Sequence, residues 1–362
     1  MWITRASVGI PVLLLLLGAV CPPAPSCAAN WPQDDDFIWA GRLTAQQAQA
    51  AEDKLKTDSD NFALHAQLAE YYFGEMVRSP SDALEEKREQ HIFWLIEHHP
   101  QSRAAGSPTA GIQPIGSMGS VDSYQHGKQL WLQQVDNHAG DARVLRNAAQ
   151  FVMLEEKKLR RDLLERAWAL VPGDSYTAMM LAQSYHAERM LAGTPEEKAA
   201  LSQKALAIRE LALEKNAGIE RFYLLADTAM EALDARETAK AEQYANELLQ
   251  SSGGSKSDWN YGNAIHKGHI VLGRVALQRG DLEGAKQHLI AAGETPGSPQ
   301  LNSFGPNMTL AKELLEKGER DTVVAYLESC RKFWKMGGDK LEGWIAAVKS
   351  GGTPDFGANL LY

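Results

Sequence analysis

Histidine is the residue type whose spacing in this chain comes nearest to metal or catalytic chemistry. His266 and His269 are three residues apart in an apolar segment that is expected to be helical, so their rings could share a metal ion. The three residues that follow are aliphatic, and no nearby carboxylate completes a ligand set. His98 and His99 end another helical segment. A histidine at this end of a helix interacts favourably with the negative end of the helix dipole, which explains their position without a metal. We therefore expect no metal and no cofactor.

Recognisable catalytic motifs are missing from the sequence. It contains no phosphate-binding loop, dinucleotide fingerprint, zinc-protease helix or Gly-x-Ser-x-Gly nucleophile motif. Ser329 and Lys332 have a Ser-x-x-Lys spacing, but the other signatures of that enzyme class are absent. We expect a protein that is not an enzyme. The alternative is a cell-envelope hydrolase with a site in residues 101–127 or around His266.

Composition and charge restrict both the fold class and the partners. The formal net charge is -9 over 362 residues, so the chain lacks the basic character that binding to nucleic acid requires. Residues that favour helices are abundant, whereas runs of alternating polarity rich in Val, Ile and Thr are nearly absent. We expect an all-α fold and no nucleic-acid partner.

The first 29 residues have the pattern of an export signal. Arg5 is the only charged residue among them, an apolar run follows it, and small residues end the segment. The pattern predicts a signal peptide over residues 1–29 and a mature protein that is periplasmic or extracellular. No later segment is long and apolar enough to span a bilayer, so we expect no transmembrane span in the mature chain. Cleavage leaves Cys330 as the single cysteine, which cannot form an internal disulfide.

The segment 268–299 contains His269 and shows how the helices of this chain are arranged. Its sequence is GHIVLGRVALQRGDLEGAKQHLIAAGETPGSP. Its apolar residues recur three or four apart on both sides of a Gly280–Asp281 break, which predicts two helices joined by a short turn. Asp281 can cap the second helix. Gly273 and Ala285 are small enough to lie where two antiparallel helices cross, since a larger side chain would push the helix axes apart.

This spacing resembles the tetratricopeptide repeat, in which Leu-Gly and Tyr mark the first helix and Ala, an aromatic residue and Pro mark the second. Further copies of the first-helix pattern have small residues in the same place. With the copy at 268–299 included, the copies begin at Leu68, Asn147, Leu181, Leu225, Leu272 and Leu310. The resemblance implies an α-solenoid of antiparallel helix pairs, a right-handed superhelix, over residues 30–362. The alternative is an ordinary α-helical domain whose hairpins mimic a repeat.

Two segments depart from the repeat pattern. Residues 101–127 are rich in Gly, Ser, Ala and Pro and predict an irregular loop that Ile112, Ile115 and Met118 could anchor. Residues 340–349 predict a capping helix that covers the end of the stack, as solenoids require. The C-terminal third also resembles exported bacterial proteins of unassigned activity, which agrees with export and adds no function.

By resemblance to tetratricopeptide proteins, the first helix of each pair lines a concave groove that binds a protein or peptide. Side chains that flank the packing residues of these helices are then expected in the groove. They are Arg146, Tyr176, Met180, Gln183, His186, Tyr223, Asp227, Arg274 and Lys312. The cations among them could bind an acidic segment, or they are scattered surface charges.

We therefore expect an exported bacterial scaffold or adaptor that binds another protein or peptide. Besides a hydrolase, the remaining alternative is a protein of the cell envelope that binds glycans or small molecules. Tryptophan rings could stack on sugars in such a protein. The candidates are Trp31, Trp39, Trp131, Trp168 and Trp259.

Overall fold

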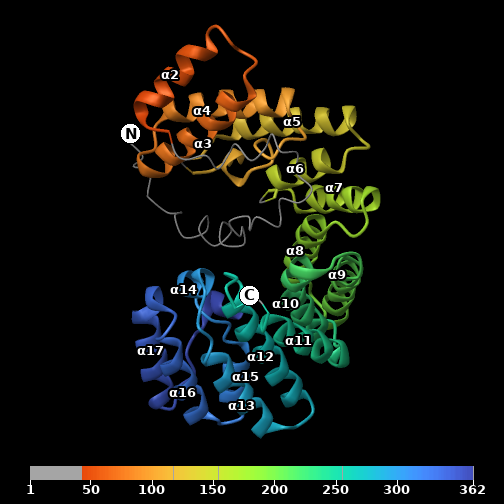
Figure 1. Ribbon diagram of the computed structural model, residues 1–362, viewed down its shortest axis with the longest axis vertical. Helices are drawn as coiled ribbons and strands as arrows, with labels where there is room; N and C mark the ends of the chain where they lie inside the picture. The colour runs from red at the N-terminus through yellow and green to blue at the C-terminus, as the bar shows by residue number, and fades with distance from the viewer. Residues whose placement is uncertain (1–42, 117, 154, 255, 362) are drawn as a thin grey trace. The chain divides into compact units, whose positions relative to one another are not determined.

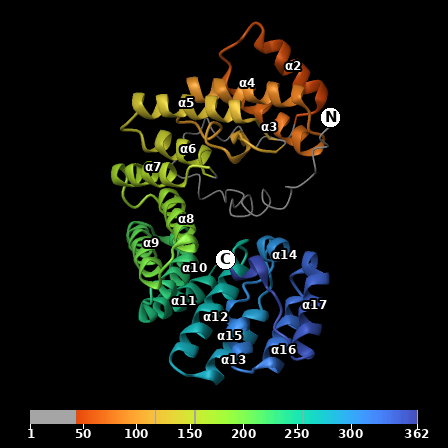
Figure 2. The same cartoon turned by 180° about the vertical axis from the view of Figure 1, so that it is seen from behind.

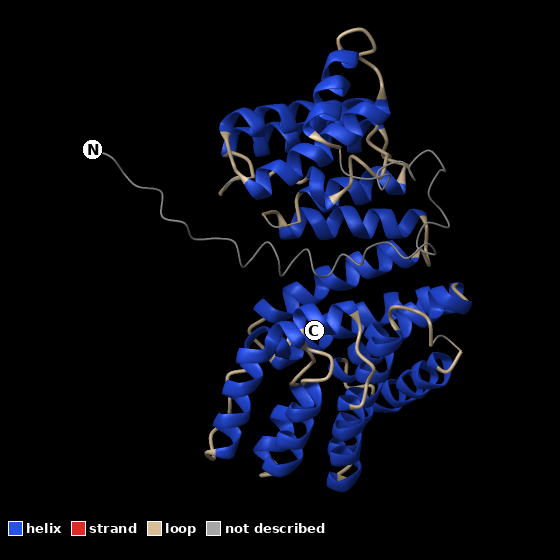
Figure 3. Cartoon of the chain, turned by 60° about the vertical axis from the view of Figure 1, so that its left-hand side comes forward, coloured by secondary structure: helices blue, strands red, loops and turns tan. Residues whose placement is uncertain are grey.

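The computed structural model describes residues 43–116, 118–153, 155–254 and 256–361, in which sixteen α-helices and no strand occur (Figures 1 and 3). The predicted signal peptide, Trp31 and Trp39 lie outside the described residues. The chain divides into two compact units at residues 184 and 185, within helix α8 (Ser175–Leu191), and each unit is considered by itself. The all-α prediction is confirmed.

The first unit consists of helices that pack consecutively, α3 on α4, α4 on α5, α5 on α6 and α6 on α7. Their bounds are α2 Ala45–Leu55, α3 Phe62–Arg78, α4 Asp82–His98, α5 Val121–Asn137, α6 Ala142–Phe151 and α7 Lys157–Leu170, with a 3-10 turn η3 at Pro108–Ala110. Side chains cap most of these helices. Asn61, Ser81, Ser120 and Asp141 each accept a hydrogen bond from a backbone N–H of the first turn.

The second unit continues the same pattern, with α9, α10, α11, α12 and α13 each packed on the next, then α13 on α16 and α16 on α17 (Figures 1 and 2). The α-helices are α9 Pro195–Lys215, α10 Gly218–Asp234, α11 Thr238–Ser252, α12 Tyr261–Gln278, α13 Leu282–Gly293, α14 Pro299–Phe304, α15 Thr309–Glu316, α16 Arg320–Cys330 and α17 Gly338–Lys349; the 3-10 turns are η4 Lys335–Gly337 and η5 Gly357–Leu360. Consecutive packing of neighbouring helices is the arrangement of an α-solenoid.

The predicted hairpin at residues 268–299 forms α12 and α13. Gly280 has a φ of 80°, a left-handed conformation that glycine adopts at little cost, and Asp281 accepts from the N–H of Gly284 to cap α13. Gly273 is buried where α12 meets α15, and Ala285 is fully buried. The small residues of the other copies are also buried, as expected for close helix crossings. They are Ala69, Ala148, Ala182, Ala226 and Ala311.

The segment predicted as a loop over residues 101–127 is shorter in the structure, because α5 begins at Val121. Ser120 caps α5, and Gly127 lies inside this helix against the ring of Phe151, where a Cβ atom would be 2.6 Å from Cζ. Gly127 therefore permits close helix packing instead of a loop. Within the remaining loop, Ile112 is buried, whereas Ile115 is 80 % exposed and does not anchor the loop.

The C-terminal residues cover the end of the second unit. Helix α17 includes the predicted capping segment, and Phe356 packs edge-on against Trp344 with ring centroids 5.0 Å apart. Asn359 holds the tail in place, because its side-chain amide donates to the carbonyls of Phe304 and Pro306 and its own carbonyl accepts from the N–H of Met308. The C-terminal tail thus packs back on α17 at Phe356.

Candidate functional site

The residues predicted to line a groove fall into both units. Arg146, Tyr176, Met180 and Gln183 belong to the first unit, and His186, Tyr223, Asp227, Arg274 and Lys312 belong to the second. The prediction is wrong for Met180, which is 2 % exposed and packs in the core. The five residues of the second unit lie on α8, α10, α12 and α15, and α12 contacts both α10 and α15 (Figures 1 and 2). We call the side chains of His186, Arg189, Tyr223, Asp227, Asp234, Lys267, Arg274, Lys312 and Glu313 the polar row.

The centre of the polar row is Asp227 of α10. Its carboxylate accepts a hydrogen bond of 2.8 Å from Nζ of Lys267 on α12, and Nη1 of Arg209 on α9 lies 3.8 Å away. Burial by itself would raise the pKa of Asp227, but Lys267 and Arg209 hold that pKa well below its usual range. Asp227 is therefore ionised, and its side chain is still 43 % exposed.

Two further hydrogen bonds involve residues of the polar row. Nε of Arg274 on α12 donates to Glu313 of α15 at 2.9 Å. Lys312, the neighbour of Glu313, is exposed and has no ion pair among the described residues. Tyr223, one turn before Asp227, donates its hydroxyl to Asp258 at 2.6 Å.

The α8 end of the polar row contains Arg189 and His186. Nη2 of Arg189 lies 2.6 Å from the Asp234 carboxylate and donates to Nδ1 of His186 at 3.0 Å. Since Nδ1 accepts this hydrogen bond, the proton of the neutral imidazole is on Nε2. Burial and the charge of Arg189 lower the pKa of His186, so the ring is neutral near pH 7.

The predicted residues of the first unit form a separate group. Nη1 of Arg146 donates to Asp174 at 2.7 Å, and its guanidinium lies over the Tyr176 ring at 5.3 Å. Gln183 is half-buried on α8. Arg146 and Arg274 thus both contact a carboxylate of this chain, so an acidic partner would have to compete with Asp174 or Glu313 for them.

The structure gives His266 a role in packing. Its ring is buried, Nδ1 donates to the carbonyl of Ala292 at 3.2 Å, and Nε2 accepts from the N–H of Asn307 at 3.1 Å. Both nitrogens are therefore occupied by backbone groups, and burial lowers the pKa of His266 to about 4. Among the described residues, no group of three or more His, Cys, Asp and Glu side chains could hold a metal ion.

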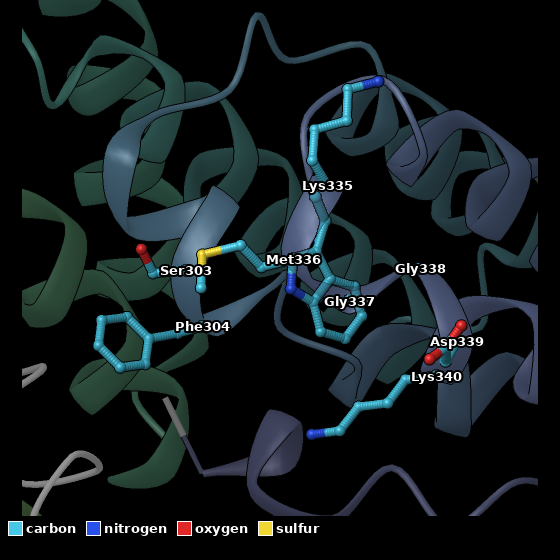
Figure 4. Close-up of a pocket in the computed structure, with 9 residues that line it drawn as sticks. Ser303, Phe304, Lys335, Met336, Gly337, Gly338, Asp339 and Lys340 are labelled. Atoms are coloured by element: carbon cyan, nitrogen blue, oxygen red, sulfur yellow. The ribbon is translucent and has the colours of Figure 1, made fainter.

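The tryptophans considered for sugar stacking do not form an exposed platform among the described residues. Trp131 is 1 % exposed, and Trp168 and Trp259 are half-buried. A hollow of about 490 Å³ lies beside a fourth tryptophan, Trp334, between α14 and the start of α17 (Figure 4). Its lining includes Phe304, Met336 and Lys340, which places apolar and cationic side chains around one opening.

Sequence reasoning missed three arginines that occupy positions on buried helix faces. Arg88 of α4, Arg160 of α7 and Arg209 of α9 are each more than nine-tenths buried. The sequence spacing could have indicated that these arginines are buried. Each one is followed by buried residues three and four positions later on its helix, so it occupies a position of the apolar stripe.

Comparison with protein-family models and with curated protein sequences gives no match. The fold defines the chain as an all-α protein of consecutively packed helices, compatible with a helical repeat. None of the helices in the described part of the chain has the length and apolar character needed to cross a membrane.

Proposed function

We propose that this chain is an exported bacterial scaffold or adaptor that binds an extended segment of another protein along the polar row of its second unit. The observation that carries the proposal is the alignment of partly exposed charged side chains across α10, α12 and α15, joined by the Asp227–Lys267 and Arg274–Glu313 pairs. Packed neighbouring helices hold this surface in place before a partner binds, which lowers the entropy cost of binding.

The alternation of charge along the polar row favours a segment of mixed charge. A partner that carries only acidic groups would be repelled by Asp227, Asp234 and Glu313, and a wholly basic one by Arg189, Lys267 and Lys312. Complementary pairing along such a surface contributes to specificity and to the rate of association. The repeat-like arrangement of the helices and the tetratricopeptide resemblance support the same class of function.

Capture of envelope proteins from a bacterial extract by immobilised chain tests the proposal. Arg274→Ala combined with Lys312→Ala removes two cations from the polar row. The matched control, Lys317→Ala combined with Lys332→Ala, removes two exposed cations outside it. We expect the first variant to lose at least tenfold in capture of a specific protein and the control to retain it. Equal capture by the two variants contradicts the proposal.

Export is a separate part of the proposal, and it rests on the pattern of the first 29 residues. Expression of the full chain in a Gram-negative host should give a periplasmic or secreted product whose N-terminus begins near residue 30. N-terminal sequencing of the fractionated product measures this. A cytoplasmic product that retains Arg5 contradicts export.

A further inference from the structure

Two pairs of histidines join the two helices of a hairpin through their rings. In the hairpin of α12 and α13, Nδ1 of His269 and Nδ1 of His288 are 3.1 Å apart. In the hairpin of α3 and α4, Nδ1 of His65 and Nδ1 of His91 are 3.0 Å apart. These are hydrogen-bond distances, so in each pair one ring donates its Nδ1–H and the other ring accepts.

The two pairs occupy equivalent positions in two copies of the repeat pattern. The first histidine of each pair lies three residues before the leucine that begins its copy, Leu272 or Leu68. The second histidine directly precedes a fully buried residue of the second helix, Leu289 or Ile92. The same contact between imidazoles is therefore present in both units of the chain.

The pair between α12 and α13 has the simpler surroundings. Both rings are half-buried, and among the described residues His269 and His288 form hydrogen bonds only with each other. In the other pair, Nε2 of His91 lies 3.3 Å from the Glu52 carboxylate, which favours the charged form of that ring. No described carboxylate is bonded in this way to the α12–α13 pair.

Burial opposes protonation of both rings of the α12–α13 pair. It lowers the pKa of His269 to about 4, and a charge on His288 would lower that pKa further. Burial also lowers the pKa of His288, although Asp281 at the start of α13 attracts a positive charge to this ring. The pair is therefore neutral near pH 7.

One further histidine joins the same two helices. His266 of α12 bonds through Nδ1 to the carbonyl of Ala292 on α13, and the charges of Lys267 and His269 act on it. Among the described residues of α10, α11, α15 and α16, no charged side chain bonds to either ring of the His269–His288 pair. His266 is thus the group whose titration has to be separated from that of the pair.

We infer that the His269–His288 contact is an acid-sensitive latch that holds α13 against α12. When both rings are protonated, neither Nδ1 can accept a hydrogen bond, and two positive charges lie side by side. The contact that stabilises the hairpin in neutral solution then becomes repulsive. Because the pKa values in the closed hairpin lie below the ordinary histidine value of about 6.5, this stabilisation is complete above about pH 6.5 and is lost as the pH falls towards 4.

Hydrogen exchange of the α13 amides in the full chain measures how often this helix opens, once rates are corrected for the intrinsic exchange at each pH. A histidine whose pKa is about 4 in the closed hairpin and about 6.5 in the open one raises the opening constant about 30-fold between pH 7.5 and pH 5. We expect wild-type protection of α13 to fall at least tenfold over this interval. A chelator in all samples removes any contribution from bound metal ions.

A double substitution separates the pair from the rest of the hairpin. His269→Gln with His288→Gln replaces the rings by two amides, which can bond to each other and do not titrate. The fall in α13 protection should be at least tenfold smaller in this variant than in the wild type, and the titration of His266 cancels because both proteins contain it. The matched control, His65→Gln with His91→Gln, changes the equivalent pair of the other unit and should leave the α13 response at its wild-type size.

The inference is overturned if wild-type protection of α13 falls less than tenfold, or if it falls as steeply in the His269→Gln, His288→Gln variant. If that variant does not fold, NMR titration of the wild-type imidazoles decides. Titration of both His269 and His288 well below pH 6.5, together with the loss of α13 protection, supports the latch. Titration of both rings at the ordinary histidine value overturns it.

Discussion

Replacement of Gly273 by alanine tests whether small residues at helix crossings hold the second unit together. A Cβ atom at this position would lie 2.3 Å from Cδ2 of Leu310 and 3.2 Å from Cβ of His288. An ordinary carbon–carbon contact is about 3.5–4.0 Å, so α15 must move away by about 1 Å or Leu310 must change its rotamer. Leu310 is fully buried, which leaves it little room.

The size of the effect follows from two opposing terms. Alanine is favoured over glycine inside a helix by about 0.5–1 kcal/mol, whereas overpacking of a core costs about 1–3 kcal/mol. Gly343 of α17 provides the matched control, because a Cβ atom there meets nothing within 4 Å. We expect Gly343→Ala to stabilise the chain and Gly273→Ala to destabilise it. Because both variants gain the helix preference of alanine, the difference between them is the overpacking cost of about 1–3 kcal/mol.

Urea unfolding followed by far-UV circular dichroism measures the free energy of unfolding of each variant. The midpoints alone show whether each substitution stabilises or destabilises the chain. The Gly273→Ala midpoint should fall below that of the wild type, and the Gly343→Ala midpoint should rise above it. If both substitutions stabilise the chain to the same extent, Gly273 does not lie at a close helix crossing and the packing described for α12 and α15 is wrong.

Three further predictions concern buried polar groups. Arg88→Met should lower the free energy of unfolding by about 3 kcal/mol or more, since it orphans three carbonyls, and proteolysis should then cut residues 101–120 faster. The pKa of His266 is about 4 in the folded chain and near 6.5 in the unfolded one, so its contribution to the free energy of unfolding is complete above about pH 6.5, and about 3 kcal/mol is lost as the pH falls to 4. His266→Gln should reduce this pH dependence in urea titrations. Cys330 is buried, and that burial raises the pKa of its thiol. In a chain that lacks residues 1–29, where Cys330 is the single cysteine, a thiol reagent should therefore modify it only as fast as the chain unfolds.

Helix pairing was predictable from the sequence because it depends on local spacing. The apolar and small residues from Leu272 to Ala292 fix two helical faces, and Gly280 with Asp281 fixes the turn between them. Gly127 was misread for a physical reason: the sequence cannot distinguish a glycine needed for a turn from one needed for close packing against Phe151.

The candidate site was predictable only in part. The resemblance singled out Asp227 and Arg274, but their partners Lys267 and Glu313 come from other helices, and spacing along one helix does not define contacts between helices. Arg160 was detectable in principle, since it occupies the stripe of Leu163 and Leu164 on α7. Only the folded structure shows that no carboxylate of the described residues pairs with Arg160.

The most direct test of partner binding is site-specific photocrosslinking from two exposed positions of the second unit. A photoreactive phenylalanine analogue replaces Lys312 at the polar row in one variant and Gln243 of α11, outside the row, in the other. The account predicts that position 312 gives a discrete crosslinked product with an envelope protein and that position 243 does not. A product from position 243 alone, or the same products from both positions, would contradict the assignment of the polar row as the binding surface.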